Sequence, residues 1–245
     1  ENPSSGAWDP HARANFAVVT GSGVAIFDTR AMQISSKITR VSHNSQTVLD
    51  CDYDQKKQHA LSTCGDDGVL RSWDLRNPES AVAVHHGHEH SVFSVRINPV
   101  YELTASVSAD GTARLWHCGW ETRHKASSAS GVSLGNHGYA VLCAAFAPDA
   151  TKMVTGSGDG RVRVWDCSRD VFSPDDDNAK KPNKNINPLA SLDTQFGAVR
   201  CVATGDEGNS PLCATGGEDG TVRVWSWVAS FEEKGDARDD DGALT

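Results

Sequence analysis

Four histidines stand close together in the stretch VHHGHEH, and histidine is a common ligand of zinc and other transition metals. They are His85, His86, His88 and His90. A metal site needs imidazoles that converge from fixed positions, usually with a cysteine or carboxylate beside them, and a short histidine tract alone is weak support. We interpret the tract as a loop between two structural units and predict no metal site.

Two glycine-containing strings have spacings that could mark an active site. Gly131–Gly135 fits the G-x-S-x-G nucleophile elbow of hydrolases, but that motif needs a strand before it and a helix after it. Here KASSAS precedes the string and NHGYA follows it. The glycines at 156, 158 and 160 suggest a phosphate-binding loop, yet they open no helix. No paired carboxylates accompany either string, so we predict no catalytic residue, no cofactor and no enzymatic activity.

The elements around these strings follow one pattern, which is a tight Asp-Gly turn, an alternating strand and then Trp. The four segments are CGDDGVLRSWD (64–74), VSADGTARLWH (107–117), GSGDGRVRVWD (156–166) and GEDGTVRVWS (217–226). In each segment the Asp lies six residues before the Trp, and successive Trp residues are 43, 49 and 60 positions apart. This pattern resembles the WD40 repeat, in which four strands form one blade of a β-propeller.

The WD40 resemblance implies a buried hydrogen-bonded relay in each blade, because an indole N–H and a carboxylate both need partners when buried. The residues expected in it are His43, His88, His137, Ser108, Ser157, Asp67, Asp110, Asp159, Asp219, Trp73, Trp116, Trp165 and Trp225. Gly65 and Gly217 stand at the Ser position, and Gln195 stands where His is expected. We therefore expect weaker relays in the first and last full repeats.

The repeat spacing also predicts the domain organisation. Residues 1–30, with Phe27 in the Trp position, are expected to be the end of a degenerate blade. We predict WD repeats over 31–74, 75–117, 118–166 and 191–231, a flexible insertion at 167–190 and an acidic disordered tail at 232–245. The predicted fold is an all-β WD40 propeller of about five blades, the C-terminal part of a seven- or eight-blade ring rather than a closed ring of five.

Charge and cysteine content exclude several classes of protein. The net charge is −9, from 23 basic and 32 acidic residues, so nucleic acid is not an expected partner. Seven cysteines form no C-x-x-C pair, and most of them lie in strand patterns, where they are expected to be small buried thiols in a reducing cytosol. No apolar run of about eighteen residues is present in this sequence, so no membrane span is predicted.

Two surface features could bind a protein partner. Trp73, Asp74 and Arg76 resemble the W-D-x-R box by which WD40 proteins dock on the adaptor of cullin-4 ubiquitin ligases, and FDTR (27–30) is a weaker copy. The alternative is that Trp-Asp is only the repeat ending and Arg76 a surface charge. The fold class further implies that loop residues at one end of the propeller form a binding rim. The alternative is that these loop residues are only exposed to solvent. The rim residues are Gln46, Asp66, His90, Tyr139, Phe196 and Glu218.

The first half resembles one WD-repeat family more specifically. SGAWDPH (5–11), FDTRAM (27–32), LDCDYDQKKQHALSTCGDDG (49–68) and SWDLRN (72–77) follow one another as in the EARP and GARP complex-interacting protein family. The order of repeats after Trp116 departs from that family, because two blades follow instead of one. The resemblance implies a non-enzymatic adaptor that binds a multisubunit tethering complex in endosomal recycling and endosome-to-Golgi traffic. It also implies a cytoplasmic protein that is peripheral at the trans-Golgi network and endosomes. The alternative to the adaptor function is that the protein is a substrate receptor of a cullin-4 ubiquitin ligase, which would use the W-D-x-R box.

Overall fold

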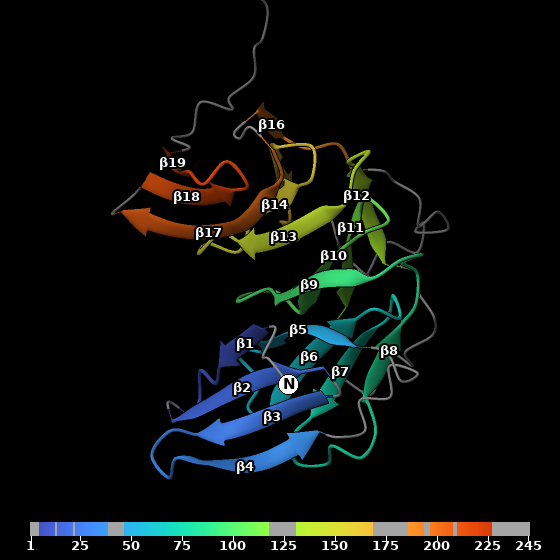
Figure 1. The fold of residues 1–245 in the computed structure, drawn as a ribbon, viewed down its shortest axis with the longest axis vertical. Coiled ribbons are helices and arrows are strands. Elements are labelled where there is room, and N and C mark those ends of the chain that lie inside the picture. The colour runs from blue at the N-terminus through green and yellow to red at the C-terminus, as the bar shows by residue number, and fades with distance from the viewer. Residues whose placement is uncertain are drawn as a thin grey trace, which may run out of the picture.

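The described residues of the protein form an arc of five antiparallel β-sheets (Figure 1). The computed structural model describes residues 5–12, 14–21, 23–38, 47–117, 131–168, 186–193, 197–207 and 210–226. Each sheet is a meander in which consecutive strands pair, and we number the sheets as blades 1 to 5 along the chain. The expectation of an all-β propeller with about five blades is confirmed.

The strands of each blade follow the chain order. Blade 1 contains β1 (Ser5–Trp8), β2 (Asn15–Thr20), β3 (Gly23–Asp28) and β4 (Gln33–Ile38). Blade 2 contains β5 (Val48–Tyr53), β6 (Ala60–Gly65), β7 (Leu70–Asp74) and β8 (Ala83–His85). Blade 3 contains β9 (Val92–Ile97), β10 (Leu103–Ser108), β11 (Thr112–His117) and β12 (Val132–Asn136). Blade 4 contains β13 (Val141–Phe146), β14 (Lys152–Ser157), β15 (Arg161–Asp166) and β16 (Ala190–Asp193). Blade 5 contains β17 (Val199–Glu207), β18 (Ser210–Gly217) and β19 (Val222–Ser226).

Two predicted boundaries differ from the observed sheets. The first sheet has four strands from Ser5 to Ile38, so residues 1–30 are not merely the end of a blade. The first three predicted repeats end one residue after the Trp, at 74, 117 and 166, whereas each four-stranded sheet includes one more strand, which pairs with the Trp strand. Most of the predicted insertion (169–185) and the whole acidic tail lie outside the described residues.

The turns and strands form where the sequence pattern placed them. Gly68, Gly111, Gly160 and Gly220 follow the turn Asp in four blades, and each has a positive φ between 74° and 80°. This is the left-handed conformation that glycine adopts without steric cost, which explains the Asp-Gly pairs. In blade 4, β14 and β15 pair in register around this turn, with Gly156 opposite Val162.

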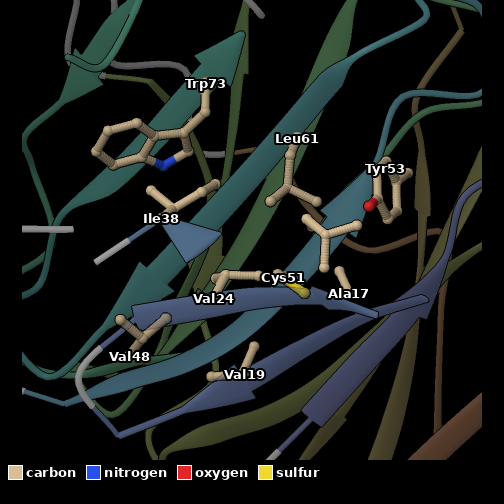
Figure 2. Close-up of a cluster of buried hydrophobic side chains, with 10 residues drawn as sticks. Ala17, Val19, Val24, Ile38, Val48, Cys51, Tyr53, Leu61 and Trp73 are labelled. Carbon is tan, nitrogen blue, oxygen red and sulfur yellow. The ribbon is translucent and has the colours of Figure 1, made fainter. Parts of the chain in front are cut away.

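The hydrophobic core is divided among the spaces between neighbouring blades. Figure 2 shows the first of these clusters, where Ala17, Val19 and Val24 of blade 1 meet Leu61 and Trp73 of blade 2. Trp116 packs against blade 2 and Trp165 against blade 3 in the same way. Trp73, Trp116 and Trp165 are each at most 2% exposed. The Trp of each repeat therefore joins its own blade to the preceding one.

The inner strand of each blade contacts the inner strand of the next. β1, β5, β9, β13 and β17 follow one another along the inner side of the arc (Figure 1). In the described part of the chain, no helix is long and apolar enough to cross a membrane.

Candidate functional site

The complete relay occurs in blade 3. The Trp116 indole donates its N–H to Ser106 Oγ at 2.7 Å, and the same Oγ lies 2.8 Å from His88 Nε2. His88 Nδ1 lies 2.8 Å from Asp110 Oδ2 in the turn. Burial raises the pKa of Asp110, but the hydrogen bonds from His88 and Thr112 outweigh it and hold the pKa below its usual range. The relay thus connects the turn to the blade interior.

In blade 4 the relay is interrupted before it reaches the turn. Trp165 donates to Thr155 Oγ1, and His137 Nε2 lies 2.9 Å from the same oxygen. His137 Nδ1 is buried and has no hydrogen-bond partner among the described residues. Asp159 instead accepts a hydrogen bond from Arg163 at 2.7 Å. Burial, followed by the charge of Arg163, lowers the pKa of His137 to about 4, so His137 stays neutral at pH 7.

An arginine two residues before each Trp competes for the turn Asp. Ion pairs join Arg71 to Asp67 at 2.8 Å and Arg223 to Asp219 at 3.0 Å, as Arg163 joins Asp159 in blade 4. In blade 3 the Asp binds His88, and the guanidinium of Arg114 lies over the Trp116 ring, 6.0 Å from its centroid. The turn Asp therefore takes one of two partners, depending on the blade.

The prediction that Ser108 and Ser157 belong to the relay is wrong, because neither of them accepts the indole hydrogen bond. Ser108 donates to the carbonyls of His90 and Ser91, and Ser157 donates to the carbonyl of Ala140. The indole acceptor lies ten residues before the Trp, where every full repeat has Ser or Thr. These acceptors are Thr63, Ser106, Thr155 and Thr215. Gly65 and Gly217 therefore do not weaken the relay, and the ten-residue spacing was the signal available in the sequence.

The predicted binding rim is built by backbone hydrogen bonds that repeat in four blades. The residue before the turn Asp donates its N–H to the carbonyl of the residue before the inner strand. The pairs are Asp66 to Thr47, Ala109 to Ser91, Gly158 to Ala140 and Glu218 to Ala198, at 2.9–3.0 Å. The turn and the entry loop consequently lie side by side at one end of blades 2 to 5.

The rim residues that the structure describes are on the surface. Asp66, His90 and Glu218 are exposed, and Tyr139 is 64% exposed. Glu218 forms an ion pair with Arg200, which lowers the pKa of that carboxyl. His43, Gln46 and Phe196 lie outside the described residues.

The W-D-x-R box lies at the opposite end of blade 2 from the rim. Trp73 is buried, whereas Arg76 is 70% exposed and forms a bidentate ion pair with Asp74, with Nη2 to Oδ2 at 2.6 Å. The side-chain hydrogen bonds from Arg76 lower the pKa of Asp74 to about 2. In the weaker copy, Asp28 accepts the backbone N–H of Arg30 at 2.8 Å. Within the box only Arg76 is well exposed, and its charge is already paired with Asp74.

A buried polar cluster that the sequence analysis missed joins blades 1, 2 and 3. Asp50, 3% exposed, accepts hydrogen bonds from Ser5 Oγ, from Ser94 Oγ at 2.9 Å and from Arg96 Nη1 at 2.6 Å. Asp52 accepts the backbone N–H of Ile97 at 2.8 Å, and burial raises its pKa to about 6. This cluster could have been predicted from the two aspartates in the inner strand LDCDY, because the inner strands are otherwise mainly apolar.

The other candidate groups have structural contacts in the described part of the chain. His88 belongs to the relay, and the His85 ring packs against Trp116 with ring centroids 5.4 Å apart. Ser133 lies inside β12, opposite Arg114, and is not at a strand-to-helix turn. Burial raises the pKa of the Cys143 thiol to about 12, so it is protonated at pH 7. Among the described residues, no three metal-ligating side chains converge.

Comparison with known families agrees with this architecture. Residues 1–116 match the EIPR1 β-propeller family. Residues 130–166 and 186–226 match the WD domain, G-beta repeat family. The predicted resemblance of the first half is confirmed, and the second half carries more general WD repeats.

Three curated relatives are similar to parts of the chain. EARP-interacting protein 1 of Caenorhabditis elegans is 40% identical over 99 residues, which are 40% of this chain and 27% of the relative. The WD repeat-containing protein DWA2 of Arabidopsis thaliana is 34% identical over 125 residues, 51% of this chain and 34% of the relative. EARP and GARP complex-interacting protein 1 of Rattus norvegicus is 38% identical over 111 residues, 44% of this chain and 28% of the relative. The matches thus cover about a quarter to a third of each relative, and these names give no support to the ligase-receptor alternative.

Proposed function

Because this chain is a WD40-repeat β-propeller whose first 116 residues match the EIPR1 β-propeller family, we propose that it is a non-enzymatic scaffold that binds a vesicle-tethering complex. The observation that carries the proposal is the similarity of its first blades to relatives named for interaction with the EARP and GARP complexes. The exposed rim supports it, because Tyr139 and paired charges offer anchors of the kind found in protein interfaces.

The finer parts of the proposal concern the cellular step. We place the protein in the cytoplasm, peripheral at the trans-Golgi network and endosomes, where it serves endosomal recycling and endosome-to-Golgi traffic. The proposed partner surface is the rim, with Asp66, His90, Tyr139 and Glu218 as its described members. No ligase function is proposed for Trp73, Asp74 and Arg76.

The test is direct binding between purified components. The chain is immobilised, and purified EARP and GARP complexes are passed over it in a biosensor, with the Caenorhabditis elegans relative immobilised as a positive control. We expect saturable binding of at least one complex to the chain. Binding by the relative and none by the chain would overturn the proposal.

A further inference from the structure

An arginine stands two residues before the Trp of each full repeat, and only the blade 3 arginine lacks a carboxylate partner among the described residues. In the other three repeats the arginine forms an ion pair with the Asp of its own turn at 2.7–3.0 Å; these arginines are Arg71, Arg163 and Arg223. In blade 3 the equivalent aspartate, Asp110, is bound by His88 instead. Arg114 Nε is buried and has no hydrogen-bond partner in the described part of the chain. Arg114 is therefore a partly buried cation without a counter-ion there.

Packing, rather than an ion pair, holds the Arg114 guanidinium in place. It lies over the ring of the buried Trp116, 6.0 Å from the ring centroid. A Cβ atom added at Gly87 would lie 2.7 Å from Arg114 Nη1 and 3.1 Å from the far edge of the Trp116 ring. The glycine thus leaves the room that the guanidinium occupies. The charge sits between blade 3 and the segment that follows β8, the last strand of blade 2.

Histidines add hydrogen-bond donors to the same region. The His85 ring packs against Trp116, and its Nε2 is buried without a hydrogen-bond partner among the residues that the structure describes. Burial, followed by the charges of His117 and His86, lowers the pKa of His85 to about 4. His86 and His117 therefore lie near His85, and both are exposed. One guanidinium and three imidazoles are gathered where blades 2 and 3 meet.

This arrangement favours an anion with several acceptor oxygens. A partly buried charge is costly unless it is paired, and a guanidinium fork pairs best with two oxygens of one anion. A carboxylate carries one charge, whereas a phosphate group carries about −1.5 to −2 and three accepting oxygens, which also suit imidazole donors. Asp110, four residues before Arg114, does not fill this role, because it accepts hydrogen bonds from His88 and Thr112.

We propose that Arg114 binds a phosphate group where the last strand of blade 2 meets blade 3. The guanidinium pairs with two of its oxygens, and His85 and His86 donate hydrogen bonds to the others. The inference goes beyond the proposed function, because the site uses none of the rim residues and requires no tethering complex. The phosphate group belongs either to a free phosphate ion or to a phosphorylated side chain, and the experiment distinguishes these sources.

The test is titration of the full chain with inorganic phosphate, followed by isothermal titration calorimetry at constant ionic strength in a buffer that contains no other phosphate. Arg114→Gln should weaken phosphate binding about tenfold or more, because it removes a charge-assisted pair of hydrogen bonds. Arg114→Lys keeps the charge without the fork and should weaken binding less. Arg223→Gln is the matched control, because Arg223 has the same position in its repeat and is paired with Asp219.

Thermal unfolding provides a second measurement that does not depend on the heat of binding. Phosphate should raise the melting temperature of the unchanged chain and of Arg223→Gln, since a ligand that binds only the folded state stabilises it. Arg114→Gln should lose this increase. An equal increase in all variants would be a general effect of the salt on the protein surface and would overturn the proposal. Binding of acetate as tight as that of phosphate would also overturn it, because the site would then select carboxylates.

Two phosphate probes distinguish the sources. If N-acetyl-phosphoserine amide binds more tightly than inorganic phosphate, the site receives a phosphorylated side chain; otherwise it receives free phosphate. The same chain separates this inference from the proposed function. If phosphate binds through Arg114 and neither the EARP nor the GARP complex binds, the tether proposal fails and the phosphate site stands. If a complex binds and phosphate has no effect that depends on Arg114, the phosphate site is wrong and the tether proposal stands.

Discussion

His88 Nδ1 and Asp110 Oδ2 lie 2.8 Å apart, and this contact distinguishes blade 3 from the blades in which an arginine holds the turn Asp. Both side chains are nearly inaccessible, at 1% and 6% of their side-chain area. Because His88 also contacts Ser106, one residue supports both the turn and the Trp116 indole.

His88→Ala should therefore lower the free energy of unfolding by about 1–3 kcal/mol, since it leaves buried polar atoms of Ser106 and Asp110 with fewer partners. Urea unfolding followed by tryptophan fluorescence measures the change. His86→Ala is the control, because His86 is exposed. Equal unfolding midpoints for the two variants would contradict this role of His88.

Thr155→Val should be more destabilising than Ser157→Ala. Thr155 Oγ1 accepts the Trp165 indole hydrogen and contacts His137, so valine leaves two buried polar groups without a partner at about 1–3 kcal/mol. Ser157 Oγ donates to a loop carbonyl, and its loss should cost about 1 kcal/mol or less. Thermal unfolding of both variants measures the two losses of stability. A larger loss for Ser157→Ala than for Thr155→Val would mean that Ser157 belongs to the relay.

Acid should destabilise the fold through His137 and His85, whose pKa values burial lowers to about 4. The unfolded chain binds a proton at each histidine below about pH 6.5, whereas the folded state keeps the histidine neutral until the pH nears 4. The contribution of each neutral histidine to the free energy of unfolding is therefore fully present above about pH 6.5 and is lost as the pH falls toward 4. The loss at pH 5 should be on the order of 1–2 kcal/mol for each histidine. Chemical unfolding at pH 7 and pH 5 measures it, and His137→Gln should show a smaller difference than the unchanged chain. An equal difference in both would show that His137 does not titrate in this range.

Asp52 should have the opposite pH dependence. Burial raises its pKa to about 6, so the folded state binds the proton more tightly than the unfolded state does. The charged form opposes folding above about pH 6, and this effect disappears as the pH falls toward 4. Asp52→Asn should therefore stabilise the protein at pH 7.5 and change little at pH 4.5, as measured by urea unfolding at both values.

Asp50→Asn provides the contrast within the same polar cluster. Asp50 accepts hydrogen bonds from Ser94 and Arg96, so removing its charge leaves a partly buried guanidinium with a weaker partner. We expect a loss of about 1–3 kcal/mol at pH 7.5, because Asp50 is buried but the Arg96 side chain is 37% exposed, so water can solvate part of the charge that remains. Stabilisation by Asp50→Asn would mean that the cluster does not hold the blades together.

The fold could be predicted from the sequence because its signals are local. The Asp-Gly pairs place positive-φ glycines such as Gly111 and Gly160 at the turns. The alternation in segments such as RVRVW then places Val162 and Val164 on the buried face. The relay could be predicted only in part, because the Trp and Asp positions follow from repeat spacing, whereas the choice between Ser106 and Ser108 depends on strand pairing across the blade.

The sequence by itself determined the repeated blade, its turns and the buried Trp, since each depends on residues within about a dozen positions of one another. Only the tertiary structure decided which partner each turn Asp takes and how Asp50 joins Ser5 and Arg96 across three blades. The physical reason is that His88 lies 22 residues from Asp110, and Ser5 and Arg96 lie 45 and 46 residues from Asp50, so these contacts form only when distant strands pack together.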